Sequence, residues 1–241
     1  GHKMAVEAIA CDAAVVKYGQ VIGFAREDIA PGSWVHEHNV YLHSFDRDYA
    51  FGTETKPTAF VTPERRRTFQ GFRRANGKYG TRNYVAVLTS VNCSASAARF
   101  IADHVTRSGI LADYPNVDGV ISLVHGTGCG LDTHGEAYEL LKRTQWGFAT
   151  NPNVGGVLMV GLGCEAFQIP RWMRSYGISE DATFRTLTIQ EVGGTRKTVE
   201  AGVRAVEEML PIVNQATRGE APASELMLAL QCGGSDGYSG I

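Results

Sequence analysis

A repeated pattern, in which an apolar run ends in a small-residue loop that carries a cysteine, most constrains what this chain can fold into. The four copies are Tyr84–Val91 before Cys93, Gly119–Val124 before Cys129, Val157–Val160 before Cys164 and Leu226–Leu230 before Cys232. A fifth apolar run, Phe184–Ile189, ends in a similar loop without a cysteine. If these runs are parallel strands, their loops share one edge of a sheet, where open α/β sheets bind ligands. The pattern therefore predicts a site at that edge.

The segments between the apolar runs have helical character. They cover residues 94–107, 133–145, 165–176 and 195–217. In the last of them, valines and one leucine recur at spacings of three and four, which is typical of an amphipathic helix on a sheet; they are Val199, Val203, Val206, Leu210 and Val213. Strands that alternate with helices imply right-handed crossovers. Residues 84–241 are therefore predicted to form an α/β domain with a five-stranded, parallel, Rossmann-like sheet layer.

Two segments precede this domain. Residues 1–45 contain short β-prone runs at 15–16, 20–25 and 34–36, separated by glycine and proline turn signals, and they predict a partial small β-rich domain. Residues 46–83 follow with Pro57, Pro63 and the charged run Glu64–Arg67. This composition is typical of an extended, solvated linker.

Composition narrows the classes of partner. The chain has 241 residues, 44% hydrophobic residues and a net charge of −2, so it can bury a core and has no electrostatic reason to bind nucleic acid or an anionic membrane. No apolar run reaches the roughly 18 residues of a membrane span. The five cysteines do not have the clustered spacing of a small secreted domain, which predicts a reducing cytoplasm. A homo-oligomer is compatible with all of this.

The cysteines can be read in two ways. Any one of them is explained by packing, because cysteine is a small and often buried residue that suits a tight turn. Four in equivalent positions favour chemistry, since a thiolate at a helix N-terminus is a soft ligand for iron or zinc. The candidate metal ligands are Cys93, Cys129, Cys164 and Cys232. Their neighbours His125, His134, Glu165 and Asp236 are candidate ligands or proton-transfer groups.

One motif points to another class of protein. Residues 161–166, Gly-Leu-Gly-Cys-Glu-Ala, follow a predicted strand and satisfy the G-x-G-x-x-A form of the dinucleotide fingerprint. Pro170 comes early in the following helix, and the unit is not the first strand–helix turn of the sheet. A nicotinamide enzyme is therefore the alternative with less support.

The chain resembles the altronate/galactarate dehydratase family over essentially its whole length. The residues that carry the resemblance are Gly1–Lys3, Ile29–Gly32 with Val35–Asn39, Arg74–Gly77 with Gly80–Asn83, Gly161–Glu165, and Cys232–Gly237 with Ser239–Ile241. The resemblance implies a small N-terminal β domain, a linker and a catalytic part that depends on iron(II) or manganese(II). It also implies that the family's small domain starts before Gly1 and that its catalytic part continues past Ile241.

The reaction that the resemblance implies is loss of water from a sugar acid of the altronate or galactarate type, giving a 2-keto-3-deoxy acid. A base must remove the proton next to the carboxylate, and a Lewis acid must help hydroxide leave. His125 is the preferred base, with His2 as the alternative. The other candidate catalytic residues are Arg82, as a carboxylate clamp, Glu165 and Asp236. The candidate substrate-binding residues are Asn83, Gly233, Gly234, Ser235 and Ser239, and the cysteines hold the metal, with an iron–sulfur cluster as a further alternative.

Other functions stay open at this point. The same family resembles enzymes that expel sulfite from sulfolactate, and four cysteines also suit a structural zinc site in a protein that only binds ligands. Because one sheet edge offers only one wall of a pocket, we expect activity to need chain beyond Ile241.

Overall fold

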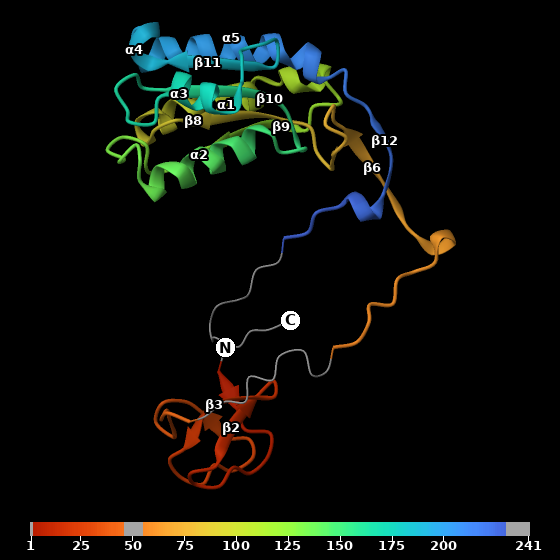
Figure 1. The fold of residues 1–241 in the computed structure, drawn as a ribbon, viewed down its shortest axis with the longest axis vertical. Helices are drawn as coiled ribbons and strands as arrows, with labels where there is room; N and C mark the ends of the chain where they lie inside the picture. Colours follow the sequence, from red (N-terminus) through yellow and green to blue (C-terminus); the bar gives the residue numbers. More distant parts are fainter. Residues whose placement is uncertain (1, 46–54, 230–241) are drawn as a thin grey trace. The chain divides into compact units, whose positions relative to one another are not determined.

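The computed structural model describes residues 2–45 and 55–229, which divide into two compact units (Figure 1). The first unit contains the described residues up to Phe60 together with Leu228 and Ala229, and the second runs from Val61 to Met227. Each unit has a hydrophobic core of its own. The fold class predicted from the sequence, an α/β unit preceded by a small β-rich unit, is confirmed.

The first unit is built from short antiparallel strands. Strands β2 (Ala14–Lys17), β3 (Gln20–Ala25) and β5 (Val40–Tyr41) form one sheet, and β1 (Lys3–Met4) pairs with β4 (Trp34–Val35) in another. Tyr18 and Gly19 both have positive φ, which is what a two-residue hairpin turn between β2 and β3 requires. The small core consists of Ala5, Val15, Ala25, Ile29 and Val35.

Two strands of an antiparallel sheet in the second unit lie inside the predicted linker. Strands β6 (Thr68–Arg73) and β7 (Tyr79–Gly80) pair with each other, and β6 also pairs with β12 (Arg218–Pro222). Residues 46–83 are therefore not extended linker throughout. The pairing of β6 with β12 could not be predicted from the sequence, because nearly the whole unit separates the two strands and no local pattern shows it.

The centre of the second unit is a four-stranded parallel sheet. Its strands are β8 (Tyr84–Thr89), β9 (Gly119–Leu123), β10 (Val154–Gly161) and β11 (Phe184–Thr188), in the spatial order β11-β10-β8-β9. Four of the predicted strands are therefore present and parallel. The helices are α1 (Ala95–Ser108), α2 (Glu136–Ala149), α3 (Ile169–Tyr176), the short α4 (Ile189–Val192) and α5 (Thr195–Val213), with 3-10 turns at 63–65, 92–94, 110–113 and 223–225.

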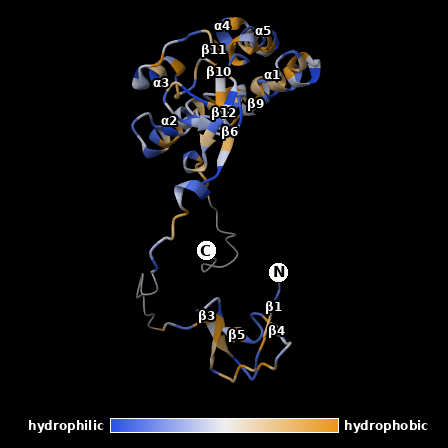
Figure 2. Cartoon of the chain, turned by 90° about the vertical axis from the view of Figure 1, so that its right-hand side faces the viewer, coloured by the Kyte–Doolittle hydropathy of each residue, from blue (hydrophilic) through white to orange (hydrophobic). Residues whose placement is uncertain are grey.

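The helices cover the two faces of this sheet. Helices α1 and α5 pack against Val85, Val87, Leu158 and Val160 on one face, whereas α2 and α3 pack against Ala86, Leu88 and Met159 on the other. The alternation of inward-facing residues along each strand produces this division. In Figure 2 the helices show hydrophobic and hydrophilic residues side by side, as amphipathic elements do. Gly202 of α5 has no room for a Cβ, which would lie 2.3 Å from the Ile101 side chain of α1.

The predicted fifth strand, 226–231, is not observed where the structure describes it. Leu226–Ala229 have no regular secondary structure, and residues 230–231 lie outside the described residues. Handedness explains why Leu226–Ala229 do not extend the sheet beside β11. Helix α5 lies on the same face as α1, and on that face a right-handed crossover leads from β8 toward β9, away from the outer edge of β11. The chain instead continues from α5 into β12.

Within residues 2–45 and 55–229, none of the helices combines the length and the apolar composition that crossing a bilayer requires.

Candidate functional site

Strands β8 and β10 lie side by side at the centre of the parallel sheet, and the chain leaves them in opposite directions. From β8 it crosses to β9 on one side, and from β10 it crosses to β11 on the other. The carboxyl ends of two such strands border the crevice in which open α/β sheets bind ligands. The loops at these ends, 90–94 and 161–168, are therefore the first place to look for a site.

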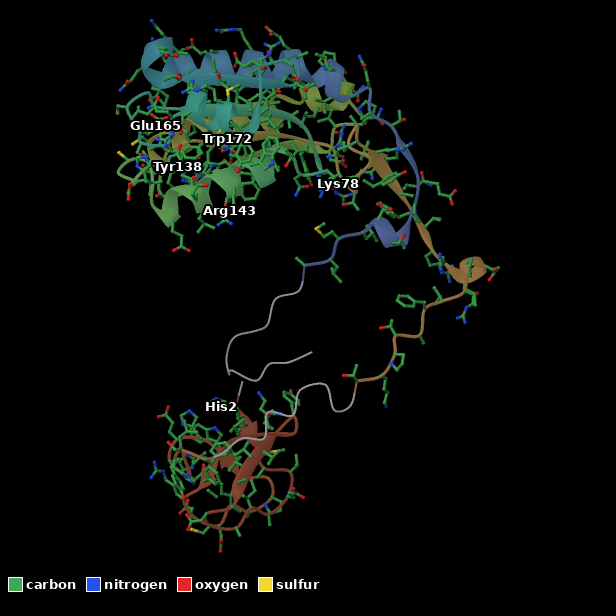
Figure 3. All side chains as sticks on the ribbon, in the orientation of Figure 1. His2, Lys78, Tyr138, Arg143, Glu165 and Trp172 are labelled. Atoms are coloured by element: carbon green, nitrogen blue, oxygen red, sulfur yellow. The ribbon has the colours of Figure 1, made fainter. Side chains whose placement is uncertain are left out.

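A buried carboxylate joins these two loops. The Glu165 side chain is only 4% exposed, although its neighbour Cys164 is exposed. Its Oε1 accepts hydrogen bonds from the Ser90 hydroxyl at 2.5 Å and the Leu162 amide at 3.1 Å, and its Oε2 accepts one from the Gly163 amide at 2.6 Å. Three donors on one carboxylate fix the loop after β10 to the end of β8. Figure 3 labels Glu165 at this end of the second unit.

The loop after β9 is held between the other two. The Asn92 amide donates to the Thr127 carbonyl at 2.9 Å, and the Ala166 and Phe167 amides donate to the carbonyls of Cys129 and Gly128 at 3.0 and 3.1 Å. Gly128 is buried with φ +101°, and a Cβ there would lie 2.2 Å from the Ser90 carbonyl oxygen. Only glycine fits this close approach. The three loops therefore form one connected layer at the carboxyl end of the sheet.

His125, the predicted base, belongs to this layer. Its Nε2 lies 2.8 Å from the Thr89 carbonyl oxygen, so Nε2 carries the proton and donates. Its Nδ1 then accepts from the Thr127 amide at 3.3 Å. Both ring nitrogens are bound to backbone, so His125 braces the loop in this conformation. To act as a base, it would first have to release the Thr127 amide.

The three described loop cysteines lie on this layer with free thiols. Cys93, Cys129 and Cys164 are exposed and unbridged, and Cys93 makes a long contact of 3.6 Å to the Asn92 side chain. Within the described ranges, no three His, Cys, Asp or Glu side chains gather closely enough to hold a metal ion. The described residues alone therefore do not fit a metal site, and the prediction that cysteines hold iron or manganese stays a prediction. The predicted fourth ligand, Cys232, lies outside the described residues.

Matches to family models decide which family the chain belongs to. The model described as "D-galactarate dehydratase/Altronate hydrolase, second domain" matches residues 71–214, and the model described as "Altronate/galactarate dehydratase SAF domain" matches residues 1–43. The chain belongs to the altronate/galactarate dehydratase family.

Curated relatives agree with this assignment. Over the full chain, the sequence is 33% identical to an altronate dehydratase of Bacillus subtilis and 36% identical to a galactarate dehydratase (L-threo-forming) of Escherichia coli. It is also 30% identical, over 72% of the chain, to the beta subunit of a (2R)-sulfolactate sulfo-lyase of Chromohalobacter salexigens. The matches to the two dehydratases cover 47% of each relative, so the chain spans about half their length.

The family motif at 161–166 does not have the geometry of a dinucleotide site. In such a site, the loop amides and the following helix N-terminus face a pyrophosphate. Here the amides of Leu162 and Gly163 are bonded to Glu165, a side chain of the same loop. Helix α3 starts only at Ile169. The nicotinamide alternative therefore receives no support from the structure.

Two predicted site residues, Arg82 and Asn83, lie at the opposite end of the sheet. They precede the first residue of β8, so the length of that strand, about 20 Å, separates them from the loops. Asn83 is fully buried, and its side chain donates to the carbonyls of Asn116 and Val213 and accepts from Arg74. All of these bonds of the Asn83 side-chain amide connect parts of the unit, so this amide has a structural role. Arg82 is exposed, and its guanidinium donates to the Thr81 carbonyl at 3.3 Å.

The remaining predicted residues are distributed as follows. His2, the alternative base, is an exposed residue of the first unit, where its ring lies against Trp34. His134 is exposed before α2, and its backbone amide donates to Asp132. The candidates Gly233, Gly234, Ser235, Asp236 and Ser239 lie outside the described residues.

Sequence reasoning missed Ser90, the hydroxyl partner of Glu165. Ser90 is fully buried, directly after the apolar residues of β8. The sequence contained a weak indication of this role, because the hydroxyl of a serine that directly follows a buried strand needs a hydrogen-bond partner.

Proposed function

We propose that this chain is part of a lyase that removes water from a sugar acid of the altronate or galactarate type, leaving a 2-keto-3-deoxy acid. The observation that carries the proposal is the match of the whole chain to altronate and galactarate dehydratases at 33–36% identity. The connected loop layer at the carboxyl end of β8, β9 and β10 supports it, because that is where this class of sheet binds small molecules.

In this proposal, the chain's own residues shape one wall of the substrate pocket. Elimination requires the proton next to the carboxylate to be taken by a base while the C3 hydroxyl leaves, and both groups must be held in place. Glu165 and Ser90 keep the loops after β8 and β10 in register. His125, which follows β9 and donates to the Thr89 carbonyl, can accept a proton at Nδ1 once it is freed from the Thr127 amide.

The metal is a separate part of the proposal. Iron(II) or manganese(II), or an iron–sulfur cluster, would supply the Lewis acid that the departing hydroxide needs. Elemental analysis of protein purified without oxygen tests whether the loop thiols are involved. If they are ligands, Cys129→Ala and Cys164→Ala should each lose metal, whereas Cys11→Ala, outside the loops, should keep it. Full metal content in both loop variants would remove these cysteines from the metal site.

The reaction itself is tested with the protein at its complete natural length. It is incubated with altronate, galactarate and other sugar acids, and the 2-keto product is measured. We expect turnover of at least one of them. Absence of product from every sugar acid, under metal-supplemented and reducing conditions, would contradict the proposal.

A second candidate function is elimination of sulfite. The match to the sulfo-lyase subunit favours it, since that match covers 72% of the chain. Adding sulfolactate to the same screen, with sulfite as the measured product, distinguishes the two leaving groups. Release of sulfite without any 2-keto-3-deoxy sugar acid would make the second candidate the correct one.

A further inference from the structure

The two edges of the parallel sheet differ in what occupies their outward backbone groups. At the β11 edge, carboxylates of the preceding loop are bonded to the strand. The Phe184 amide donates to Asp181 at 2.8 Å, and the Thr186 amide donates to Glu180. At the β9 edge, no side chain within residues 2–45 and 55–229 bonds to the backbone of Gly119–Leu123, and β8 is the strand that pairs with it. The β9 edge is therefore open to another strand, whereas the β11 edge is capped.

The open edge carries apolar side chains beside its free backbone groups. Because backbone groups alternate in direction along a strand, about half of the amides and carbonyls of β9 point away from β8. Ile121 and Leu123 pair with Ala86 and Leu88, which belong to the face that α2 and α3 cover. Both β9 side chains are only partly buried there. The edge thus offers hydrogen-bonding groups and apolar surface together.

Helix α2 adds an uncharged flank. The exposed residues of this flank are Ala137, Leu140, Thr144, Gly147 and Phe148. Leu140 is 57% exposed and Phe148 is 37% exposed. The Thr144 hydroxyl donates to the Leu140 carbonyl at 2.9 Å, so this hydroxyl needs no partner from outside. An exposed flank without charge is unlike the solvated face of a surface helix and is typical of the core of a protein interface.

This flank lies toward the β9 end of the unit. On the opposite flank of α2, Trp146 stacks on Tyr176 of α3, with ring centres 4.5 Å apart. Helix α3 lies on the β11 side, since its Trp172 stacks on Phe184 at 6.1 Å. The sheet order β11-β10-β8-β9 then places the flank away from α3 on the β9 side. Figures 1 and 2 both show α2 and β9 toward one end of the unit, and β11 and α5 toward the other. The β9–α2 surface is defined as Ile121, Leu123, Leu140, Thr144 and Phe148.

The β9–α2 surface is complementary to itself. Leu140 and Phe148 lie about one helical turn on either side of Thr144. A two-fold axis at Thr144 therefore sets each Leu140 against the partner's Phe148. Antiparallel pairing of β9 with the same strand of the other copy would also satisfy the outward backbone groups of both. The net charge of −2 gives two copies little reason to repel each other.

We propose that the β9–α2 surface binds a second copy of this chain across a two-fold axis, so that two parallel sheets join edge to edge. Sedimentation of the protein at its natural length tests this interface, and we expect a dimer at micromolar concentration. A protein that stays monomeric up to millimolar concentration would overturn the proposal.

Single variants locate the interface. Leu140→Arg and Phe148→Glu each place a charge in the centre of the apolar contact, and each should raise the dissociation constant of the dimer at least about 100-fold. Phe100→Arg is the matched control, because Phe100 has the same 57% exposure but lies on α1, and it should leave the dimer unchanged. A dimer of wild-type strength in both Leu140→Arg and Phe148→Glu would contradict the proposal.

A double variant tests the two-fold arrangement. With Leu140→Arg and Phe148→Glu in the same chain, each arginine faces the partner's glutamate, and this pair forms twice. The two positions are too far apart along α2 to pair within one helix. We expect the dissociation constant to return to within about tenfold of the wild-type value. A double variant that associates no better than the single variants would contradict the two-fold arrangement.

The rest of the natural chain is the competing occupant of this surface. If it covers the β9–α2 surface, the 241-residue chain will dimerise while the protein at its natural length will not, and that result would contradict the proposal. The inference does not depend on the proposed lyase function, because association is measured without substrate or turnover.

Discussion

The two ends of the parallel sheet are both rich in polar residues, but they use them differently. At the amino end, polar side chains are bonded to one another and to the backbone: Asp118 accepts from the Asn83 backbone amide at 2.7 Å and pairs with Arg218 at 3.2 Å, and Asn153 accepts from the backbone amides of Thr81 and Arg82. At the carboxyl end, the loops are joined mainly through backbone bonds and one buried carboxylate, while three thiols face solvent.

The polar residues at the amino end therefore hold the unit together, whereas those at the carboxyl end include groups that could take part in a reaction. The amino-end network fastens the antiparallel sheet of β6, β7 and β12 to the parallel sheet. Within it, burial lowers the pKa of Arg74, whose guanidinium donates to the carbonyls of Pro152 and Arg82. A guanidinium used in this way is not available to a substrate. At the carboxyl end, by contrast, the thiols of Cys93, Cys129 and Cys164 are exposed.

The largest effect is expected from Asn83→Ala. The substitution removes the side-chain hydrogen bonds to the carbonyls of Asn116 and Val213 and one of the hydrogen bonds of the Arg74 guanidinium, inside a fully buried position. We expect a loss of about 2–4 kcal/mol in the free energy of unfolding, measured by urea denaturation. Arg82→Ala is the matched control, since the neighbouring side chain is exposed, and it should change stability by less than about 0.5 kcal/mol. Equal losses in the two variants would contradict the architectural role of the amino end.

Two glycines of the loop after β9 test the packing of the loops at the carboxyl end. Gly128→Ala forces a positive φ on alanine and places its Cβ against the Ser90 carbonyl. We expect a cost of about 2–3 kcal/mol in the same measurement. Gly126→Ala is the control, because a Cβ there meets nothing within 4 Å. If both variants were as stable as the wild type, the loop layer would not be packed as described.

A smaller effect is expected from Glu165→Gln. An amide can accept on its oxygen but presents N–H groups where the carboxylate accepts, so at least one of its three bonds is lost. We expect about 1–2 kcal/mol of destabilisation and several-fold faster alkylation of Cys164, measured by peptide mass spectrometry. Glu191→Gln, on an exposed residue after β11, should leave the Cys164 rate unchanged. An unaltered Cys164 rate in Glu165→Gln would mean that the carboxylate does not hold this loop.

The smallest effect concerns Asp181, at the amino end of β11. Burial alone would raise the pKa of its carboxyl group, but hydrogen bonds from Thr183 and Phe184 outweigh burial and lower that pKa below its ordinary value. A lowered folded-state pKa stabilises the fold at pH values above the unfolded-state pKa, and this contribution disappears as the pH falls below about 4. Asp181→Asn should therefore lose less stability between pH 5 and pH 3 than the wild type. Identical pH profiles would contradict it.

The sequence predicted the strands and their shared edge because each repeat is local. An apolar run, a small-residue loop and an amphipathic helix are all visible within about 40 residues, and the α/β fold follows from their alternation. The face of α5 is not visible in this way. It depends on which side of the sheet the helix packs, and that side decides whether the residues that follow the helix can join the sheet beside β11.

The geometry of the candidate site was predicted only in part, because its bonds are not local. The strand pattern predicted that Cys93, Cys129, Cys164, His125 and Glu165 lie at the carboxyl edge of the sheet, where the structure has them, and their roles stay predictions. Asn83 was read as a substrate ligand because its partners, Asn116 and Val213, are far away in the sequence. The Glu165 carboxylate accepts from backbone amides of its own loop, and this requires a loop conformation that cannot be read from the residue types.

The central claim is that the carboxyl-end loops of the second unit form a wall of the substrate pocket. Alkylation of cysteines in the protein at its natural length, with and without a sugar acid that it converts, tests this claim most directly. The account predicts that the acid slows alkylation of Cys93, Cys129 and Cys164 several-fold, while Cys11, an exposed thiol of the first unit, reacts at an unchanged rate. Equal rates with and without the acid at all three loop thiols would contradict it.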